Sequence, residues 1–185
     1  MQTQEKIRIR RADVADAPFV ALRVISALGV ENPDDKIVEC MTAISAMDEE
    51  LYSWRNAWIA ECGGVAAGML LAYDGANYAL WRQRTFDVLK DMMGYDLTGM
   101  QDETCAGEFY LDSLSVLPAF RRKGVARQLL KKVLEMASAQ GHSLITLAVD
   151  PDNTPAFALY RSLGFEKKGM LHIFDYDYEK MEKLL

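Results

Sequence analysis

"LSVLPAFRRKGVA", Leu114–Ala126, joins a strand-like segment to a helix-like one. Its first half has the apolar alternation of a β-strand and closes at a proline. Its second half places three cations before a glycine and an apolar, helix-like run: Arg121, Arg122, Lys123, then Gly124. A helix start normally attracts carboxylates, because its unpaired N–H groups and its dipole favour negative charge. Cations at this place therefore indicate that the loop receives an anion from outside the chain.

The residues around Gly124 indicate which anion fits. Gly124 lets a ligand approach the backbone, and the small Ala126 keeps the first helical turn open. Free N–H groups and arginine side chains both bind phosphate oxygens, so a diphosphate is expected. The alternative is a solvated basic helix start. The sequence contains neither G-x-x-x-x-G-K-[ST] nor G-x-G, which disfavours a P-loop or a Rossmann dinucleotide site.

The preceding strand, "EFYLDSLSVL", changes phase along its length. Phe109 and Leu111 are apolar at odd positions, whereas Leu114 and Val116 are apolar at even ones. A strand of period two cannot keep all four on one face unless an extra residue is inserted near Asp112. Either the strand carries a β-bulge there, or it is buried on both faces. A bulge would leave backbone N–H and C=O groups free for a ligand.

The remaining pattern alternates strands and helices with short connections, which is typical of an α/β or α+β sheet domain. Helices are expected at about 13–28, 32–47 with Asn32 as cap and Pro33 first, 77–94, 125–140 and 154–163. Strands are expected at 6–10, 57–73 as a hairpin turning at Gly63–Gly64, 108–117, 143–149 and 167–174. The last segment, 178–185, is open between strand and helix.

Composition sets wider bounds. A chain of 185 residues with 50% hydrophobic and 26% charged residues suits one globular domain. The net charge of -6 disfavours nucleic acid and anionic membrane as partners. The three cysteines are Cys40, Cys62 and Cys105, with no CxxC spacing, which favours a reducing compartment and no metal site. We therefore expect a cytoplasmic protein.

Two motifs together resemble the GNAT superfamily of acetyl-CoA-dependent N-acetyltransferases. "LSVLPAFRRKGVA" is similar to its L-x-V-x-P strand followed by [Q/R]-x-x-G-x-[G/A]. "NTPAFALYRSLGF", Asn153–Phe165, is similar to its N-x-x-A-x-x-L-Y-x-x-x-G-F. The resemblance covers 110–165 sharply and implies a mixed, mostly antiparallel sheet with a bulged central strand flanked by helices. It also implies a single domain over 1–185, with a helical insert at about 74–107.

The resemblance implies acetyl-CoA as cosubstrate and assigns roles residue by residue. The backbones of Leu114 and Val116 would pair with the pantetheine arm as an added strand does. The pyrophosphate would be held by the loop residues Arg121, Arg122, Lys123, Gly124, Val125, Ala126 and Arg127. Asn153 would hydrogen-bond the pantetheine arm, and Tyr160 would donate a proton to the departing sulfur. Without the motif, Tyr160 would be taken for a core-facing helix residue.

The implied reaction is direct attack of a primary amine, on a small molecule or a lysine side chain, at the thioester. An amine with a pKa of about 10.4 must lose a proton first, so a carboxylate near the bulge is expected as base. Asp112 is the candidate, directly or through a water, with Glu108 as second choice. The alternative for Asp112 is a bulge carboxylate held by backbone N–H groups. Two other functions stay open: a catalytically silent acyl-CoA-binding module and a phosphate- or nucleotide-binding regulator.

The acceptor is expected to be a cationic amine. The insert between Tyr73 and Glu108 mixes aromatic residues with carboxylates, which could steer a cation together with Asp112. The insert is interpreted as a lid, a packed helix or a homodimer contact. Ala148 stands where family members that acetylate protein N-termini commonly have Glu, which disfavours that substrate class.

Overall fold

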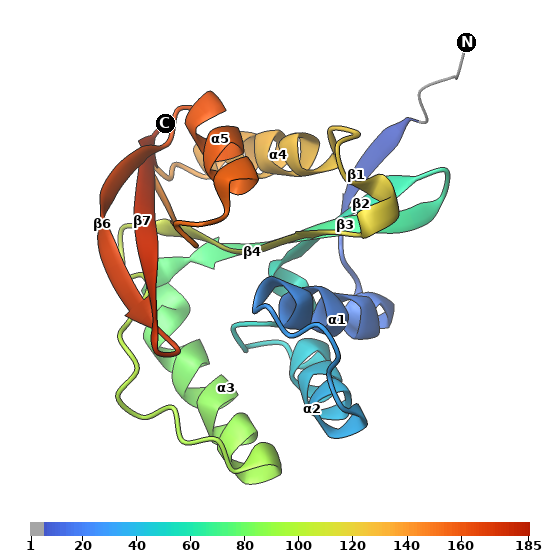
Figure 1. Cartoon of the computed structure of the whole chain (residues 1–185), viewed down its shortest axis with the longest axis vertical. Coiled ribbons are helices and arrows are strands. Elements are labelled where there is room, and N and C mark those ends of the chain that lie inside the picture. Colours follow the sequence, from blue (N-terminus) through green and yellow to red (C-terminus); the bar gives the residue numbers. More distant parts are fainter. Residues whose placement is uncertain (1–5) are drawn as a thin grey trace.

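The computed structural model describes residues 6–185, which form a seven-stranded sheet with helices on both of its faces (Figure 1). The strands are β1 (Ile7–Arg11), β2 (Ala57–Cys62), β3 (Val65–Asp74), β4 (Phe109–Val116), β5 (Leu144–Val149), β6 (Glu166–Ile173) and β7 (Tyr176–Leu184). The helices are α1 (Ala17–Ala27), α2 (Asp35–Ala46), α3 (Tyr78–Met93), α4 (Val125–Ala139) and α5 (Thr154–Ser162).

The strand order is β1-β2-β3-β4-β5-β7-β6. Every neighbouring pair is antiparallel except β4 and β5, which are parallel. The predicted mixed, mostly antiparallel sheet is therefore confirmed. The last segment, which the sequence left open between strand and helix, forms β7 and lies between β5 and β6.

Each face of the sheet carries its own apolar core. On one face, α4 contributes Leu129, Leu130 and Val133, which pack with Ile145 of β5 and other strand residues. The other face is covered by α1, α2 and α3, as Figure 1 shows. Because β4 lies at the centre of the sheet, its side chains reach both cores.

The register of β4 confirms the predicted bulge. Across β3, Leu71 pairs with Ser113 and Ala72 pairs with Leu111, so Asp112 is the extra residue. The inserted residue corrects the phase, because Phe109, Leu111, Leu114 and Val116 all belong to the core on the α4 side. The strand is also buried on both faces, since Tyr110 belongs to the core on the other side, so the bulge and two-sided burial occur together.

One predicted helix start is wrong. The sequence favoured Asn32 as the cap of the second helix, with Pro33 at its first position. The structure begins α2 at Asp35, and the Asp34 carboxylate accepts a hydrogen bond of 2.8 Å from the N–H of Ile37. A carboxylate at that place satisfies a free N–H group and complements the helix dipole, so the cap moves two residues along the chain.

The segment between β3 and β4 packs against the body of the protein. α3 buries Phe86 and Leu89, and the Thr85 hydroxyl accepts a hydrogen bond of 3.0 Å from the N–H of Leu51. The loop that follows α3 returns to the sheet at β4 (Figure 1). Of the helices in residues 6–185, none is both long and apolar enough to cross a membrane.

Candidate functional site

The sheet opens beside β4. Pairing with β5 covers only Phe109 to Leu111, and beyond that point β4 has no strand on this side within residues 6–185. The N–H of Leu117 donates a hydrogen bond to the carbonyl of Ala67 in β3. The N–H and C=O of one strand residue point to the same side, and that side alternates from residue to residue. The N–H and C=O groups of Leu114 and Val116 therefore point into the opening. An extended ligand can pair with them there.

The N-terminus of α4 lies at the end of this strand and has no side-chain cap. Gly124 precedes the helix with φ +84°, and Arg122 also has a left-handed φ of 61°. A Cβ at Gly124 would meet no described atom within 4 Å, so the backbone is open to a ligand. The first N–H groups of a helix have no intrahelical partner, and here they face an uncapped start.

The cations expected around this start make contacts within the protein. Arg121 Nε donates a hydrogen bond of 3.1 Å to the Val116 carbonyl, so that carbonyl is already occupied. Arg127 donates to Ser162 of α5 at 2.8 Å. The Lys123 ammonium lies 5.3 Å from the ring centroid of Phe120. These contacts hold the cations near the loop.

Sequence reasoning missed a further cation, Arg23 of α1. Burial lowers its pKa, and the nearby charge of Arg121 lowers it further. The Arg23 Nε atom is buried and has no hydrogen-bond partner among the described residues. Positive charge from α1 therefore adds to that of the loop, and the Arg23 guanidinium lies 5.7 Å from the ring centroid of Phe19.

Helix α5 supplies the residues of the second motif. Asn153 caps it, since its side-chain oxygen accepts a hydrogen bond of 3.2 Å from the N–H of Ala156. Tyr160 is buried in the same core as Leu114 and Val116, and its ring lies edge-on to Phe165 at 5.8 Å between centroids. Burial raises the pKa of Tyr160 to about 12. The hydroxyl therefore stays protonated and can donate a hydrogen bond.

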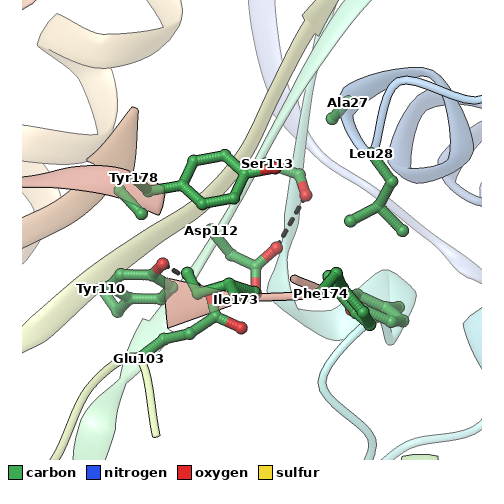
Figure 2. Close-up of a pocket in the computed structure, with 11 residues that line it drawn as sticks. Ala27, Leu28, Glu103, Tyr110, Asp112, Ser113, Ile173, Phe174 and Tyr178 are labelled. Carbon is green, nitrogen blue, oxygen red and sulfur yellow. Dashed lines mark hydrogen bonds between the residues drawn. The ribbon is translucent and has the colours of Figure 1, made fainter. Parts of the chain in front are cut away.

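A cavity of about 90 Å³ lies at the bulge of β4. Asp112 lines it, and its carboxylate accepts hydrogen bonds from Tyr73 at 2.6 Å and Ser113 at 2.7 Å. Glu103 enters from the loop after α3 and accepts a hydrogen bond of 2.6 Å from Tyr110. Figure 2 shows both carboxylates in the middle of the cavity, between Tyr110 on one side and Phe174 on the other.

The two carboxylates raise each other's cost of ionisation. Burial is the main cause that raises the pKa of Glu103 to about 7, and the charge of Asp112 adds to it. Burial also raises the pKa of Asp112, against the hydrogen bonds from Tyr73 and Ser113. Like charges in a small cavity resist simultaneous ionisation, so burial and the charge of Asp112 keep the proton on Glu103 to a higher pH than on an exposed carboxyl group. Such a pair is suited to accept a proton.

Glu108, the second choice for the base, lies in a different environment. Its carboxylate accepts hydrogen bonds from Lys180 at 2.8 and 2.9 Å, from Thr104 and from Thr146. Burial alone would raise its pKa, but these bonds outweigh burial and lower it. Glu108 does not line the cavity, and its contacts make it a structural ion pair between β4 and β7.

The other carboxylates of the insert do not line the cavity either. Asp96 pairs with Lys90 at 3.0 Å and Asp102 lies 3.5 Å from Arg82, and all four side chains belong to the insert. Among the carboxylates of the insert, only Glu103 lines the cavity together with Asp112. No sequence signal separated Glu103 from its acidic neighbours, because its partners, Tyr110 and Asp112, are set by the fold.

The chain matches the family model described as "Acetyltransferase (GNAT) family" over residues 30–165. It is 40% identical over 163 residues to an uncharacterized protein of Mycobacterium leprae, covering 88% of this chain and 40% of that protein. It is 28% identical over 183 residues to mycothiol acetyltransferase of Gordonia bronchialis, covering 89% and 52%. Thialysine N-epsilon-acetyltransferase of Bos taurus is 35% identical over 98 residues, covering 50% and 57%. The chain thus spans about half the length of the curated relatives it matches.

Solved structures agree with these relatives. A crystal structure of an acetyltransferase is 26% identical, with a TM-score of 0.79 over 96% of this chain and 98% of that one. An N-acetyltransferase from Staphylococcus aureus Mu50, at 21% identity, has the same fold with a TM-score of 0.81 over 95% and 100%. The opening beside β4 and the uncapped start of α4 agree with the family match. Because the family model covers most of the chain, the chain belongs to the acetyltransferase (GNAT) family.

Proposed function

We propose that residues 1–185 form one acetyltransferase domain, with a helical insert at about 74–107, that moves an acetyl group from acetyl-CoA to a primary amine. The observation that carries the proposal is the opening between β4 and β5, which ends at the uncapped start of α4. An opening edged by free strand peptides suits an extended amide chain, and the helix start suits a diphosphate. Acetyl-CoA combines the two.

The residues that would hold acetyl-CoA follow from this arrangement. Leu114 offers its N–H and C=O, whereas Val116 offers only its N–H while Arg121 occupies its carbonyl. The amides of residues 122–127 would hold the pyrophosphate, with the side chains of Arg121, Arg122, Lys123 and Arg127 around it and Val125 and Ala126 in the first turn. The Asn153 oxygen is used as a cap, so its amide nitrogen is the group available to the pantetheine arm.

The carboxylate pair Asp112 and Glu103 would accept the proton of the attacking amine. One oxygen of Glu103 has no hydrogen bond within residues 6–185, whereas both oxygens of Asp112 are engaged. A base is most effective when its pKa lies near the working pH, which the mutual charge and burial of this pair provide. The sequence suggested Asp112 with Glu108 as second choice; the cavity lining supports Glu103 in place of Glu108.

The N–H groups of the bulged strand would stabilise the negative charge that develops on the thioester oxygen. Tyr160 would donate a hydrogen bond to the departing sulfur. With a pKa of about 12, Tyr160 is a far weaker acid than a thiol of about 8.5, so it would stabilise the thiolate without giving up its proton for long. This refines the role of general acid that the motif implied.

The acceptor amine would enter as an ammonium ion, which the negative pair attracts. The names of the relatives differ in the amine that they indicate: a mycothiol acetyltransferase in Gordonia bronchialis, a thialysine N-epsilon-acetyltransferase in Bos taurus and an N-alpha-acetyltransferase, RimI, in Mycobacterium tuberculosis. Ala148 lines the cavity, so no Glu stands there to hold a peptide N-terminus. These observations favour a small-molecule or side-chain amine.

An acceptor screen that follows free CoA tests the proposal. Purified protein, acetyl-CoA and single primary amines are mixed, and thiol release is measured together with the N-acetyl product by mass. Equal amounts of CoA and N-acetylamine are the expected result. Thiol release without acetylamine, or none with any amine, would refute the transferase and favour an acyl-CoA-binding module.

A further inference from the structure

An apolar groove of about 610 Å³ adjoins the carboxylate cavity. The two share four lining residues, so the groove is continuous with the proposed reaction site: Leu28, Tyr52, Phe174 and Tyr178. Three distant segments meet around it, namely the end of α1 with α2, the end of α3 with its loop, and the β6–β7 hairpin. Ligand pockets are generally in the range of about 300–1,000 Å³.

The lining of the groove is almost entirely apolar or aromatic. Aliphatic side chains cover its walls, among them Ile25, Ile37, Met41, Leu89, Met93 and Leu97. Asp150 is the one lining residue with a formal charge, and its carboxylate accepts a hydrogen bond of 2.8 Å from the N–H of Asp152. The carboxylates of the insert that were expected to recognise a cation do not line the groove.

The rim of the groove leaves apolar side chains in solvent. Leu28 and Val30 are each 40% exposed, and Tyr95 is 48% exposed. Phe174 has a left-handed φ of 49°, which a bulky residue adopts only under strain, and its ring lines both the cavity and the groove. Exposed apolar side chains around a hollow indicate a surface that a ligand covers.

We infer that the groove binds the alkyl or aryl tail of the acceptor, so that the substrate class is a monoamine with an extended apolar substituent. This inference rests on the proposed acetyl transfer. The amino group would enter the cavity beside Asp112 and Glu103, and the tail would lie against Met41, Leu89 and Met93. A second ammonium on the tail would lose its hydration against an apolar wall, which disfavours polyamines.

The test compares tail length and tail charge in one assay. Propylamine, hexylamine, phenethylamine, hexamethylenediamine and spermidine are acceptors, and kcat/KM is measured by CoA release. From propylamine to hexylamine, burial of each added methylene should raise kcat/KM by about fourfold. Hexamethylenediamine should fall well below hexylamine. A preference for either polyamine, or no dependence on tail length, would overturn the inference while leaving acetyl transfer intact.

Met93 and its neighbour Met92 provide a matched pair of variants. Met93 lines the groove, whereas Met92 lies outside it and is 40% exposed. Met93→Glu should lower kcat/KM for hexylamine at least tenfold and lower it much less for propylamine, and Met92→Glu should change neither. Thermal melting of both variants checks that they fold. Equal effects of the two variants on hexylamine would contradict a tail site in the groove.

A binding measurement distinguishes failure of this inference from failure of the proposed function. Calorimetry measures hexylamine binding to the protein in the presence of CoA. If no amine is acetylated but hexylamine binds and Met93→Glu weakens it, the transferase is refuted and the groove stands as a binding site. If hexylamine neither binds nor reacts, both are refuted.

Discussion

Glu103 and Asp112 line one small cavity, and their shared titration should set the pH dependence of catalysis. A base must be ionised to accept a proton, so kcat should rise as the pH increases through about 7, the value to which the pKa of Glu103 is raised. Glu103→Gln or Asp112→Asn should each lower kcat roughly tenfold and move this rise to lower pH, because the remaining carboxylate loses a like-charged neighbour. The double variant should lose roughly 10²–10⁴-fold.

The measurement is a kcat–pH profile with one amine in all variants, so that titration of the amine itself cancels. Asp91→Asn is the matched control, since Asp91 belongs to the same insert, is exposed and does not line the cavity. It should change neither the rate nor the profile. A rise in rate that stays at the same pH in all variants would exclude the pair as the base.

Tyr160 should affect the chemical step and not binding. Tyr160→Phe removes one hydroxyl from a buried ring and leaves its packing on Phe165. We expect kcat to fall by about 10²-fold, with little change in the Kd of acetyl-CoA measured by calorimetry. With a pKa of about 12, Tyr160 should cause no loss of activity up to about pH 10. Weakened binding at normal kcat would assign Tyr160 to packing.

For single residues, the local sequence pattern predicted the place of some and missed others. The phase change in the strand located Asp112 in the bulge, because strand periodicity is a local property. The motifs placed Gly124 at the start of α4 and Asn153 at the start of α5. Glu103 and Arg23 were missed, since what distinguishes them is burial beside residues distant in the chain. Their catalytic and binding roles stay predictions.

The start of α4 is the element whose geometry the proposal needs most. Gly124 and Gly141 flank α4 with φ of +84° and +86°, and a Cβ at either would meet no described atom within 4 Å. Valine at either position should therefore destabilise the protein by a similar roughly 1–2 kcal/mol. At Gly124 it should also block the approach of a diphosphate to the backbone, and at Gly141 it should not.

Thermal shift with acetyl-CoA and with ADP measures this difference. Acetyl-CoA at about 100 times its Kd should add about 2.7 kcal/mol, or about 5–10 °C in a chain of this size. Gly141→Val should keep the shift and Gly124→Val should lose it. A shift that survives in Gly124→Val would remove the loop from the site. An equal shift with ADP would favour a nucleotide-binding regulator.

The sequence predicted where elements begin and end better than it predicted which strands lie side by side. The starts of α3, α4 and α5 and the Gly63–Gly64 hairpin lie close to the predicted places, because caps and turns are local signals. The first helix was expected from about residue 13, where Asp13 caps a short 3-10 turn, and α1 itself begins at Ala17. The start of α2 moved from Asn32 to Asp34, since several capping residues compete there. The insertion of β7 between β5 and β6 was not predicted, because strand order depends on contacts between distant residues.

At the scale of the molecule, the sheet separates two tasks. One face, with α4 and α5, would hold acetyl-CoA, and the segments on the other face form the carboxylate cavity and the apolar groove. β4 contributes side chains to the cores on both faces, so its bulge is where the thioester and the amine would meet. The surface charge predicted a cationic acceptor, but only the packed structure revealed how apolar the groove is.

Backbone amide exchange, followed residue by residue by NMR with and without acetyl-CoA, reports directly where acetyl-CoA lies on the protein. If acetyl-CoA lies along β4 and ends at α4, exchange should slow at Leu114, at Val116 and over residues 122–127. The amides of β1, at the far edge of the sheet, serve as the control and should not change. Unchanged exchange at Leu114 and residues 122–127 under saturating acetyl-CoA would contradict the proposed site.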